Sequence, residues 1–462
     1  MANDWGSIPL GDLVSLQRGH DLPSQDRLLG AIPVMGSSGV TGYHNLCKTK
    51  GPGVVIGRSG NSMGVVSYCN VDFWPLNTVL YVTDFKGNDE RYIYYLLSQI
   101  DFNQFNSGSA QKSLNRNAIY PYKIWATKNK VEQALIGKLL EEYENKIQLN
   151  RQMNQTLEQM AQALFKSWFV DFDPVMDKLL ASGKPIPEEL QAHAERRRTQ
   201  LAQLANDPDH KPLDADILAL FPDEFEYVEQ DVGNSVGISG WVPKGWESKA
   251  FGDLLEQTIG GDWGKEEYDE KHSIQSVIIR GTDIPQLLNG SQSSAPKRWV
   301  EPKKLNTRSL ADSDIVIEVS GGSPTQPTGR SLMITENLLA RLEGVVEPAS
   351  FCRKLRPINE EVGLLLGLHL KKIYAEGKTW EYQNTSTGIS NFQTKIFLAV
   401  EKVVFPPLAT LKAFFRLTRP MVDKSTSNEN IYLEKLRDTL LPKLISGELR
   451  IPEAKEKTEG AA

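Results

Sequence analysis

The sequence has few cysteines and no long apolar run. Cys47, Cys69 and Cys352 are the only cysteines among 462 residues and lie far apart, so they predict neither a disulfide framework nor a paired-cysteine metal site. We expect them to be buried thiols. No stretch approaches the roughly eighteen uninterrupted apolar residues of a membrane span, and the first residues resemble no signal peptide. These absences predict a cytoplasmic protein without a membrane segment.

The sequence also lacks the short motifs of common enzyme classes. The glycines of GPGVVIG, residues 51–57, are spaced wrongly for a dinucleotide loop, and neither Ser nor Thr follows Lys265 as a phosphate-binding loop requires. No NPPY- or DPPY-like adenine-methyltransferase motif is present, and the dispersed histidines predict neither a zinc site nor a triad. Asp223, Glu247 and Lys249 imitate a nuclease metal site, but they lack the flanking apolar strands that such a site needs.

The excess of negative charge is confined to one segment. The chain has a formal net charge of -6, yet residues 171–231 hold fifteen acidic and six basic side chains, which leaves the remainder at +3. A nucleic-acid partner therefore stays compatible with the composition. We interpret residues 174–240 as an acidic, partly helical linker or insertion. Its run of Arg196, Arg197 and Arg198 either touches phosphate or is a solvated run on a polar helix.

An internal repeat organises the rest of the chain. GDLVSL at 11–16 is matched by GDLLEQ at 252–257, and each is followed by short Val- and Ile-rich runs separated by turn residues. The runs recur in the same order in both halves. The pattern predicts two β-rich domains, at residues 1–129 and 241–406.

A long helix follows each β-rich domain, at residues 130–173 and 407–452. A gapless shift of 276 residues relates the two, setting Asn154 on Asn430, Met160 on Leu436 and Trp168 on Leu444. Apolar residues of the first helix recur by threes and fours, the seam of a coiled coil. At about 1.5 Å per residue this helix is about 60 Å long, so it needs a partner along its seam. The second helix is the available partner.

Three details of the helical regions carry expectations of their own. Pro420 should kink or interrupt the second helix. Asn150, at a seam position, either fixes the register of the pair or marks a wet position. Residues 453–462 are expected to form a disordered tail.

The predicted fold class is α+β. Two β-rich domains are separated and joined by two long antiparallel coiled-coil helices, with a pseudo-twofold internal repeat. Twofold DNA-binding proteins hold two readers at a fixed separation with two subunits. Here one chain would do so, and its two non-identical domains would read two different half-sites.

Long motifs give the chain a family resemblance. LEQMAQALFKSWFVDFDP, from Leu157, resembles the central conserved region of the specificity subunits of type I restriction-modification systems. LEKLRDTLLPKLISGELRIPEA, from Leu433, resembles their C-terminal conserved region, and GGSPTQPTGR and STGISNF, from Gly321 and Ser386, resemble stretches of their target-recognition domains. The resemblance spans nearly the full length. One departure is the long acidic insertion after Pro174.

The resemblance implies a function and partners. Two target-recognition domains would read an asymmetric bipartite site in double-stranded DNA, in the cytoplasm of a prokaryote. The conserved helices would dock two methyltransferase subunits, and motor and nuclease subunits would join that core. The chain itself would be non-catalytic and bind no cofactor; S-adenosylmethionine, ATP and Mg would be used by the partner subunits.

Candidate DNA contacts are polar or cationic side chains in turns, because donors and acceptors read base edges while Arg and Lys hold phosphates. The alternative for each is an ordinary polar surface loop. The candidates in the first half are Arg58, Ser59, Asn61, Lys112 and Arg116, and those in the second half are Ser320, Ser323, Thr325, Gln326, Thr328, Arg330, Ser386 and Asn391.

Phe165, Trp168, Phe169 and Phe172 crowd the end of the first helix. So many aromatic rings are costly to leave exposed, and such patches mark protein interfaces. We predict a partner-binding surface in which these four pack partly on a methyltransferase subunit and partly on the second helix near Leu440, Leu441 and Leu444. The alternative is that all four fill an internal core. For the whole chain, the competing hypothesis is a non-DNA coiled-coil adaptor with two β binding modules.

Overall fold

The computed structural model describes residues 4–108, 112–228, 236–290, 294–322, 325–386 and 389–451. The tail expected at 453–462 lies outside these ranges. The chain divides into two compact units: unit 1 combines residues 1–148 with 432–462, and unit 2 comprises residues 149–431. In the ranges described, no helix has both the length and the apolar character needed to cross a bilayer.

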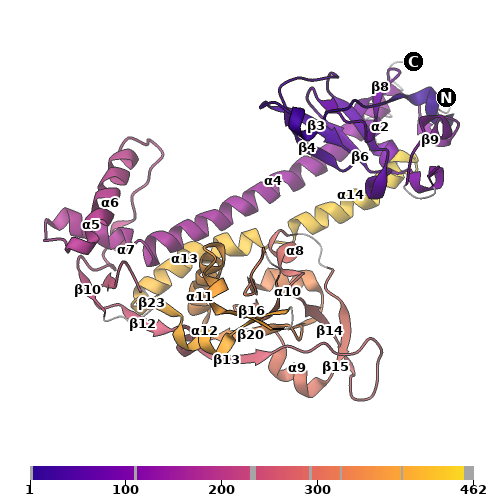
Figure 1. Cartoon of the computed structure of the whole chain (residues 1–462). Coiled ribbons are helices and arrows are strands. Elements are labelled where there is room, and N and C mark those ends of the chain that lie inside the picture. The colour runs from indigo at the N-terminus through magenta and orange to yellow at the C-terminus, as the bar shows by residue number, and fades with distance from the viewer. Residues whose placement is uncertain are drawn as a thin grey trace. The chain divides into compact units, whose positions relative to one another are not determined.

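The described strands of unit 1 form three small sheets; several of these strands are labelled in Figure 1. Their strand orders are β2-β8-β5-β6, β4-β3-β7 and β1-β9. The strands are β1 (Trp5–Pro9), β2 (Ser15–Arg18), β3 (Ile32–Gly36), β4 (Gly39–His44), β5 (Gly53–Gly57), β6 (Val66–Cys69), β7 (Trp74–Pro75), β8 (Val79–Asp84) and β9 (Lys123–Thr127). The helices are α1 (Leu10–Leu13), α2 (Glu90–Ser98), α3 (Arg116–Ile119), the first part of α4 (Lys130–Phe169) and α14 (Glu429–Ile445). Strand β5 is buried throughout, which explains its uninterrupted GVVIG sequence.

Unit 2 repeats this plan with additions. Its strands are β10 (Phe225–Tyr227), β11 (Trp241–Pro243), β12 (Glu247–Ala250), β13 (Leu255–Gly260), β14 (Ile274–Ile279), β15 (Lys297–Val300), β16 (Ile315–Glu318), β17 (Ser320–Gly321), β18 (Ser331–Met333), β19 (Val345–Pro348), β20 (Cys352–Pro357), β21 (Gln383–Ser386), β22 (Ile389–Phe392) and β23 (Lys402–Phe405). Its helices are α5 (Asp173–Ser182), α6 (Gln191–Leu204), α7 (Ala215–Leu218), α8 (Ile284–Leu288), α9 (Pro302–Arg308), α10 (Glu336–Leu342), α11 (Glu360–Ala375), α12 (Thr394–Val400) and α13 (Leu408–Ser425).

Sheet topology confirms the internal repeat. The order β13-β20-β16-β18 in unit 2 matches β2-β8-β5-β6 in unit 1, and the pair β12-β23 matches β1-β9. In the third sheet, β3 pairs antiparallel with β4 and parallel with β7, just as β14 pairs antiparallel with β15 and parallel with β19. Shared order and pairing sense mean that the two units use one β-rich plan for two different sequences.

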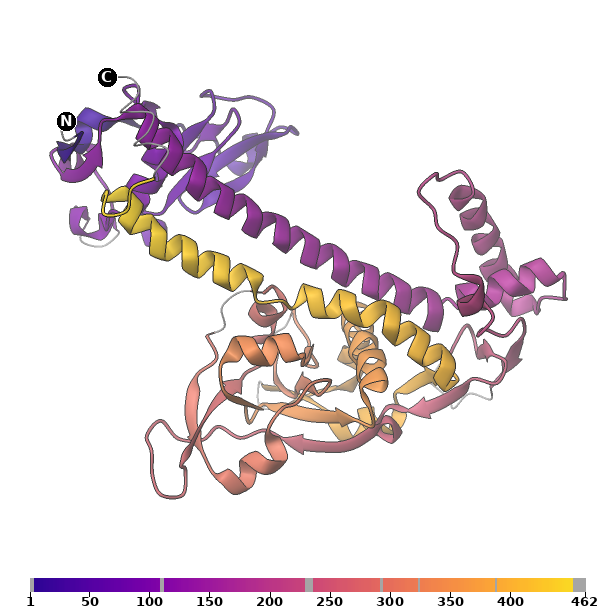
Figure 2. The same cartoon turned by 180° about the vertical axis from the view of Figure 1, so that it is seen from behind.

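The long helices pair in antiparallel directions, as predicted. In unit 1, Ile136 of α4 lies in the same core as Leu444 and Ile445 of α14. In unit 2, Trp168 at the end of α4 packs on Phe414 near the start of α13, with ring centroids 5.6 Å apart. Early α4 therefore meets late α14, and late α4 meets early α13; Figures 1 and 2 show each pair side by side within its unit.

The second long helix is interrupted at residues 426–428, six to eight residues after the expected place at Pro420. Helix α13 continues through Pro420 to Ser425, and α14 begins at Glu429. At the interruption, the hydroxyl of Thr426 donates to the backbone carbonyl oxygen of Val422 at 3.0 Å and shares a 2.9 Å hydrogen bond with Thr335. A side chain that bonds the backbone in this way competes with helical hydrogen bonding. The polar residues 426–428, rather than the proline, therefore separate the two helices.

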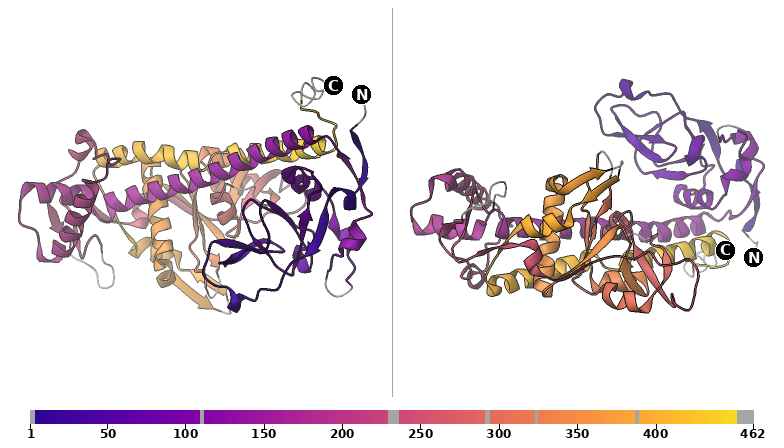
Figure 3. Two further views of the ribbon diagram at one scale, coloured as in Figure 1. Left: turned by 90° about the horizontal axis from the view of Figure 1, so that it is seen from above. Right: turned by 60° about the horizontal axis from the view of Figure 1, so that its bottom comes forward.

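The acidic segment begins with a folded helical lobe in unit 2. Helices α5 and α6 form a hairpin (Figure 3), closed by buried Met176, Leu179, Leu190 and Ala194. Arg197 of α6 donates two hydrogen bonds of 2.7 Å to the carboxylate of Asp177 on α5. Arg198 pairs with Glu195 on its own helix. Arg197 is thus engaged between the two helices, whereas Arg196 and Arg198 are exposed on α6 with partners on their own helix, as the polar-helix interpretation expects.

The cysteines are free thiols, but not all are buried. Cys69 and Cys352 are buried as expected, whereas Cys47 is exposed. Cys47 lies in a polar loop after β4, where no apolar layer covers it. Burial raises the pKa of the Cys352 thiol to about 12, which keeps it protonated and unreactive at neutral pH.

Candidate nucleic-acid interface

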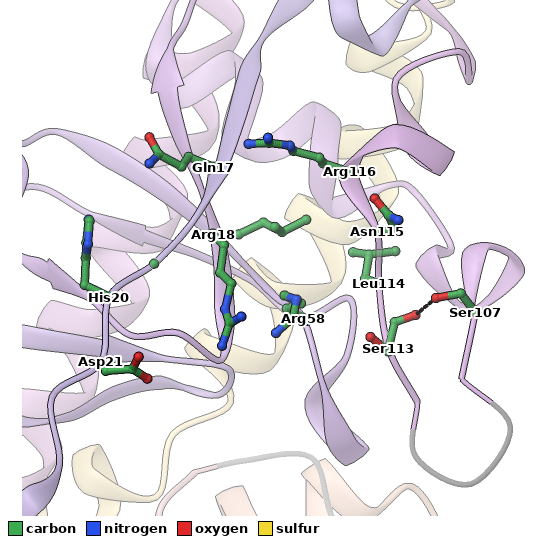
Figure 4. A pocket seen from close by; sticks show the side chains of 12 residues that line it. Gln17, Arg18, His20, Asp21, Arg58, Ser107, Ser113, Leu114, Asn115 and Arg116 are labelled. Carbon is green, nitrogen blue, oxygen red and sulfur yellow. Dashed lines mark hydrogen bonds between the residues drawn. The ribbon is translucent and has the colours of Figure 1, made fainter.

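A cavity of about 710 Å³ opens in unit 1 where β2, the end of β5 and the start of α3 meet. Arg18, Arg58 and Arg116 line it together with His20 and Asp21 (Figure 4). We call this cavity the arginine hollow. Its three guanidinium groups come from positions 40 to nearly 100 residues apart in the sequence, so only the folded sheet brings them together.

The three arginines bond to backbone oxygens in the described residues. Arg18 and Arg58 each reach the carbonyl oxygen of Asn77, at 3.4 Å, and Arg116 donates to the carbonyl oxygen of Leu16 at 3.0 Å. In the described part of the chain, none of the three forms an ion pair with a carboxylate. Asp21, the acidic group of the lining, accepts a hydrogen bond from the amide of Asn77. Guanidinium groups positioned in this way suit phosphate oxygens, which they bind through planar, directed donors.

The structure joins the two candidate segments of unit 1. The amide of Leu114 donates to the carbonyl of Arg58 at 2.8 Å, and the amide of Gly60 donates to that of Lys112 at 3.1 Å. Arg58 and Arg116 therefore face one hollow. Ser59 bridges Ser113 in the same ladder, and Asn61 is exposed in the adjoining turn. The ammonium group of Lys112 donates to the side chain of Asn103 at 2.9 Å.

Sequence reasoning missed Arg18 and His20. Neither lies in a turn, because Arg18 ends strand β2 and His20 follows it. The available signal was position: both directly follow the repeated GDL segment. His20 approaches the rings of Trp74 and Tyr81, with centroids 6.5 and 6.0 Å away.

Unit 2 carries different residues at the equivalent positions. The amide of Phe392 donates to the carbonyl of Val319 at 2.9 Å, matching the bond from Leu114 to Arg58. Val319 therefore stands where unit 1 has Arg58, and Thr394 where it has Arg116. Strand register likewise places Gly260 at the position of Arg18, and Arg353 at that of Leu80. The two units present chemically different surfaces on one backbone plan.

Two candidates of unit 2 are engaged in its interior. Arg330 donates to both carboxylate oxygens of Glu318, at 2.8 and 2.7 Å, and these hydrogen bonds raise the pKa of its guanidinium. Thr328 has no exposed surface, and its amide and hydroxyl both donate to Gln383. Burial removes Thr328 from direct contact with DNA, which corrects that prediction. The ion pair ties the guanidinium of Arg330 to Glu318, the last residue of β16.

The other candidates of unit 2 lie around the loop between β16 and β18. Ser320 pairs with Asn391 between β17 and β22. Thr325, Gln326 and Asn391 are exposed, and Ser320 is half-buried. Ser386 belongs to β21, and Ser323 falls outside the described residues.

The aromatic end of α4 is internal to unit 2, which corrects the predicted partner surface. Phe165, Trp168, Phe169 and Phe172 are each at most 5% exposed. Trp168 packs edge-on against Phe221 with ring centroids 4.8 Å apart. Leu444, by contrast, is buried in the core of unit 1, where Leu440 and Leu441 also pack. Antiparallel pairing is the reason, since it sets the end of α4 against the start of α13.

The residues that imitate a nuclease site are separately paired. Asp223 forms an ion pair with Lys184 at 2.8 Å, and Glu247 forms one with Lys249 at 2.8 Å. Over the ranges that the structure describes, no group of three or more His, Cys, Asp or Glu side chains is arranged to hold a metal ion.

Comparison with known proteins gives consistent results. Residues 2–159 match the family model of the type I restriction modification DNA specificity domain. The chain is 29% identical over 342 residues to the type I restriction enzyme HindI specificity subunit of Haemophilus influenzae, covering 70% of this chain and 68% of the relative. It is 24% identical over 385 residues to the MjaIX specificity subunit of Methanocaldococcus jannaschii, covering 79% and 71%.

A solved structure shares the fold. The type I restriction-modification S subunit from M. genitalium aligns with a TM-score of 0.53 at 14% identity, over 96% of both chains. The arginine hollow is lined by residues 17–116 and so lies within the segment that matches a DNA specificity domain. The chain is similar along most of its length to specificity subunits of type I restriction-modification systems.

Proposed function

We propose that this chain is the non-catalytic sequence reader of a type I restriction-modification complex and that it reads an asymmetric, bipartite DNA target. Each β-rich unit would contact one half-site. The observation that carries this proposal is that the two units share one topology but differ in the residues at equivalent positions. Val319 of unit 2 occupies the position of Arg58 in unit 1, and Thr394 occupies that of Arg116. One backbone plan with two lining chemistries suits two half-sites of unlike sequence.

The arginine hollow is the part of unit 1 best suited to the DNA backbone. Its guanidinium groups have no carboxylate partners among the residues described, so phosphate oxygens would supply their counter-charge. In unit 2, the exposed polar side chains of Gln326 and Asn391 and the cation of Arg353 are the corresponding contacts.

Two methyltransferase subunits would dock on the exposed apolar residues of the long helices. Leu149, Met153 and Met160 are exposed and spaced by four and seven residues, so they share one face of α4. Tyr432 and Leu436 are exposed on α14. The shift of 276 residues places Leu436 on Met160, so each long helix offers an equivalent apolar position. Motor and nuclease subunits would join this core, and S-adenosylmethionine, ATP and Mg would be bound by these partner subunits.

The test is a genome-wide map of methylated adenines in cells that carry this chain with its partner subunits, and again after its deletion. Loss of a split, asymmetric motif upon deletion is the expected result. A motif that survives deletion would contradict the proposal. Exchanging residues 4–108 of unit 1 for those of a relative should change only one half of the methylated motif. If the chain were an adaptor that does not read DNA, the same exchange would change neither half.

A further inference from the structure

Unit 1 exposes a cluster of large apolar side chains beside the arginine hollow. Leu28 and Leu29, in the loop that leads from the hollow to β3, are 60% and 102% exposed. Tyr43 at the end of β4 and Leu46 just after it are each 59% exposed. We call these four side chains the apolar patch. Clusters of this kind on a folded surface mark contacts with another molecule.

Two close approaches hold the loop of Leu28 and Leu29 against the end of β4. The amide of Leu28 donates to Nδ1 of His44 at 3.0 Å, so the loop lies against the end of β4. Gly30 approaches this segment so closely that a Cβ there would meet the carbonyl oxygen of His44 at 2.3 Å. Leu28 and Leu29 are therefore set beside the segment that carries Tyr43 and Leu46.

A single tryptophan connects the patch to the hollow. The ring of Trp74 contacts His44 on the patch side, with centroids 5.3 Å apart, and His20 on the hollow side, at 6.5 Å. Lys48 adds a cation over the same ring, with its Nζ 5.1 Å from the centroid. The buried Trp74 ring thus contacts one residue next to the apolar patch, His44, and one residue of the hollow's lining, His20.

We propose that Leu28 and Leu29 contact the bases of the DNA whose phosphates the arginine hollow holds. The inference rests on the proposed function. DNA fits both surfaces, because it offers a polyanionic backbone beside apolar thymine methyl groups and base faces. Proteins that bind DNA use exposed Leu side chains in this way, either packing them in a groove or wedging them at a base step. The hollow then supplies affinity, and the loop supplies sequence or shape preference in the half-site read by unit 1.

Base contact by the leucines and phosphate contact by the arginine hollow predict different losses of DNA affinity. Replacing Leu28 and Leu29 together by Ala should weaken binding to the preferred sequence about tenfold, with no change in salt dependence. Replacing Arg58 by Gln should weaken binding to all sequences and lower the slope of log affinity against log salt by about 1. Leu408→Ala, at an exposed position of α13, and Arg198→Gln, on α6, are the matched controls.

The experiment is selection from a pool of random-sequence duplexes, performed with the full chain and the methyltransferase subunit that co-purifies with it. The leucine variant should lose information at a few positions of one half of the selected motif. An unchanged motif and unchanged affinity would overturn the inference while leaving the proposed function intact. Loss of co-purifying methyltransferase with an unchanged motif would also overturn it, by assigning the patch to a protein partner.

The same selection experiment tests this inference separately from the proposed function on which it rests. If the unaltered chain selects no motif at all, the proposed function fails and the inference fails with it. Because Leu28 and Leu29 are exposed, their replacement should leave the thermal unfolding midpoint unchanged. A second variant, Leu29→Glu, places a negative charge against the DNA and should weaken binding more than Leu29→Ala.

Discussion

The carboxylate of Glu318 accepts two hydrogen bonds from Arg330, at 2.8 and 2.7 Å, in a buried position beneath the loop that precedes β18. This pair decides what a mutation of Arg330 measures. A buried carboxylate stripped of its counter-charge is strongly destabilising, so effects on DNA binding would follow from the altered loop.

Arg330→Ala should therefore lower the free energy of unfolding of unit 2 by about 3 to 5 kcal/mol. Chemical denaturation of the variant and of the unaltered chain measures the difference. The double change with Glu318→Leu removes the stranded carboxylate and should recover part of the loss. Unchanged stability with weaker DNA binding would instead identify Arg330 as a direct DNA contact.

Trp168→Ala should destabilise unit 2 by about 3 to 5 kcal/mol, because it empties a packed core site. The indole contacts Phe221 and Phe414, with ring centroids 4.8 and 5.6 Å away. The matched control is Met160→Ala, eight residues earlier on the same helix and 49% exposed, which should change stability by less than about 0.5 kcal/mol. Thermal unfolding distinguishes the two variants. A Trp168→Ala variant that stays folded and stable but no longer binds the methyltransferase subunit would restore the interpretation of this aromatic cluster as a partner interface.

Met160→Asp and Leu436→Asp should each reduce the amount of methyltransferase subunit that co-purifies with the chain. Each change places a charge at an exposed apolar position, where docking would bury it without a partner. Phe351→Asp, also exposed but far from α4 in sequence, is the control and should leave co-purification unchanged. Equal recovery of the methyltransferase subunit with all three variants would exclude Met160 and Leu436 from the docking surfaces of their two helices.

Stability should fall in acid through Glu401. Burial of this carboxylate favours its neutral form, but hydrogen bonds from His369, Lys378 and Tyr382 outweigh burial and lower its pKa from 4.5 to about 2. The ionised group therefore stabilises the fold fully above about pH 4.5, and this stabilisation, on the order of 3 kcal/mol, is lost as pH falls toward 2.

Glu401→Gln removes the stabilisation that the ionised carboxylate provides at neutral pH. The stability of the variant should therefore change little as the pH falls. Unfolding free energies of the unaltered chain and the variant should differ most near neutral pH and converge as the pH approaches 2. Parallel curves across this range would show that another group carries the acid sensitivity.

The sequence predicts the repeated parts of the fold well. Helix α4 extends from Lys130 to Phe169, within the predicted range, because its apolar residues keep helical spacing over many turns. The paired strands β5 and β6, and β16 and β18, follow from Val- and Ile-rich runs broken by turn residues. Such patterns are local in the sequence, so they can be recognised without knowledge of the tertiary contacts.

The sequence predicts the candidate site less completely. Arg18 and Arg58 converge on one carbonyl oxygen although 40 positions separate them, and no local pattern encodes that meeting. Thr328 resembles an exposed loop residue until its hydrogen bonds to Gln383, 55 positions away, are known. The aromatic residues of α4 resemble an interface because the sequence does not show Phe221 or Phe414 covering them. Burial by distant segments is the common cause.

Unit 1 draws on both ends of the described chain. Arg450 donates to Glu132 at 2.7 Å and lies over the ring of Trp5, and Leu444 is buried in the same unit. Unit 2 is a single continuous stretch, residues 149–431. On the ribosome, the unit whose synthesis starts first is thus finished last, after the whole of unit 2 has emerged. A nascent chain that stops short of α14 lacks Leu444 and Ile445, so the core of unit 1 stays incomplete until this last helix has been made.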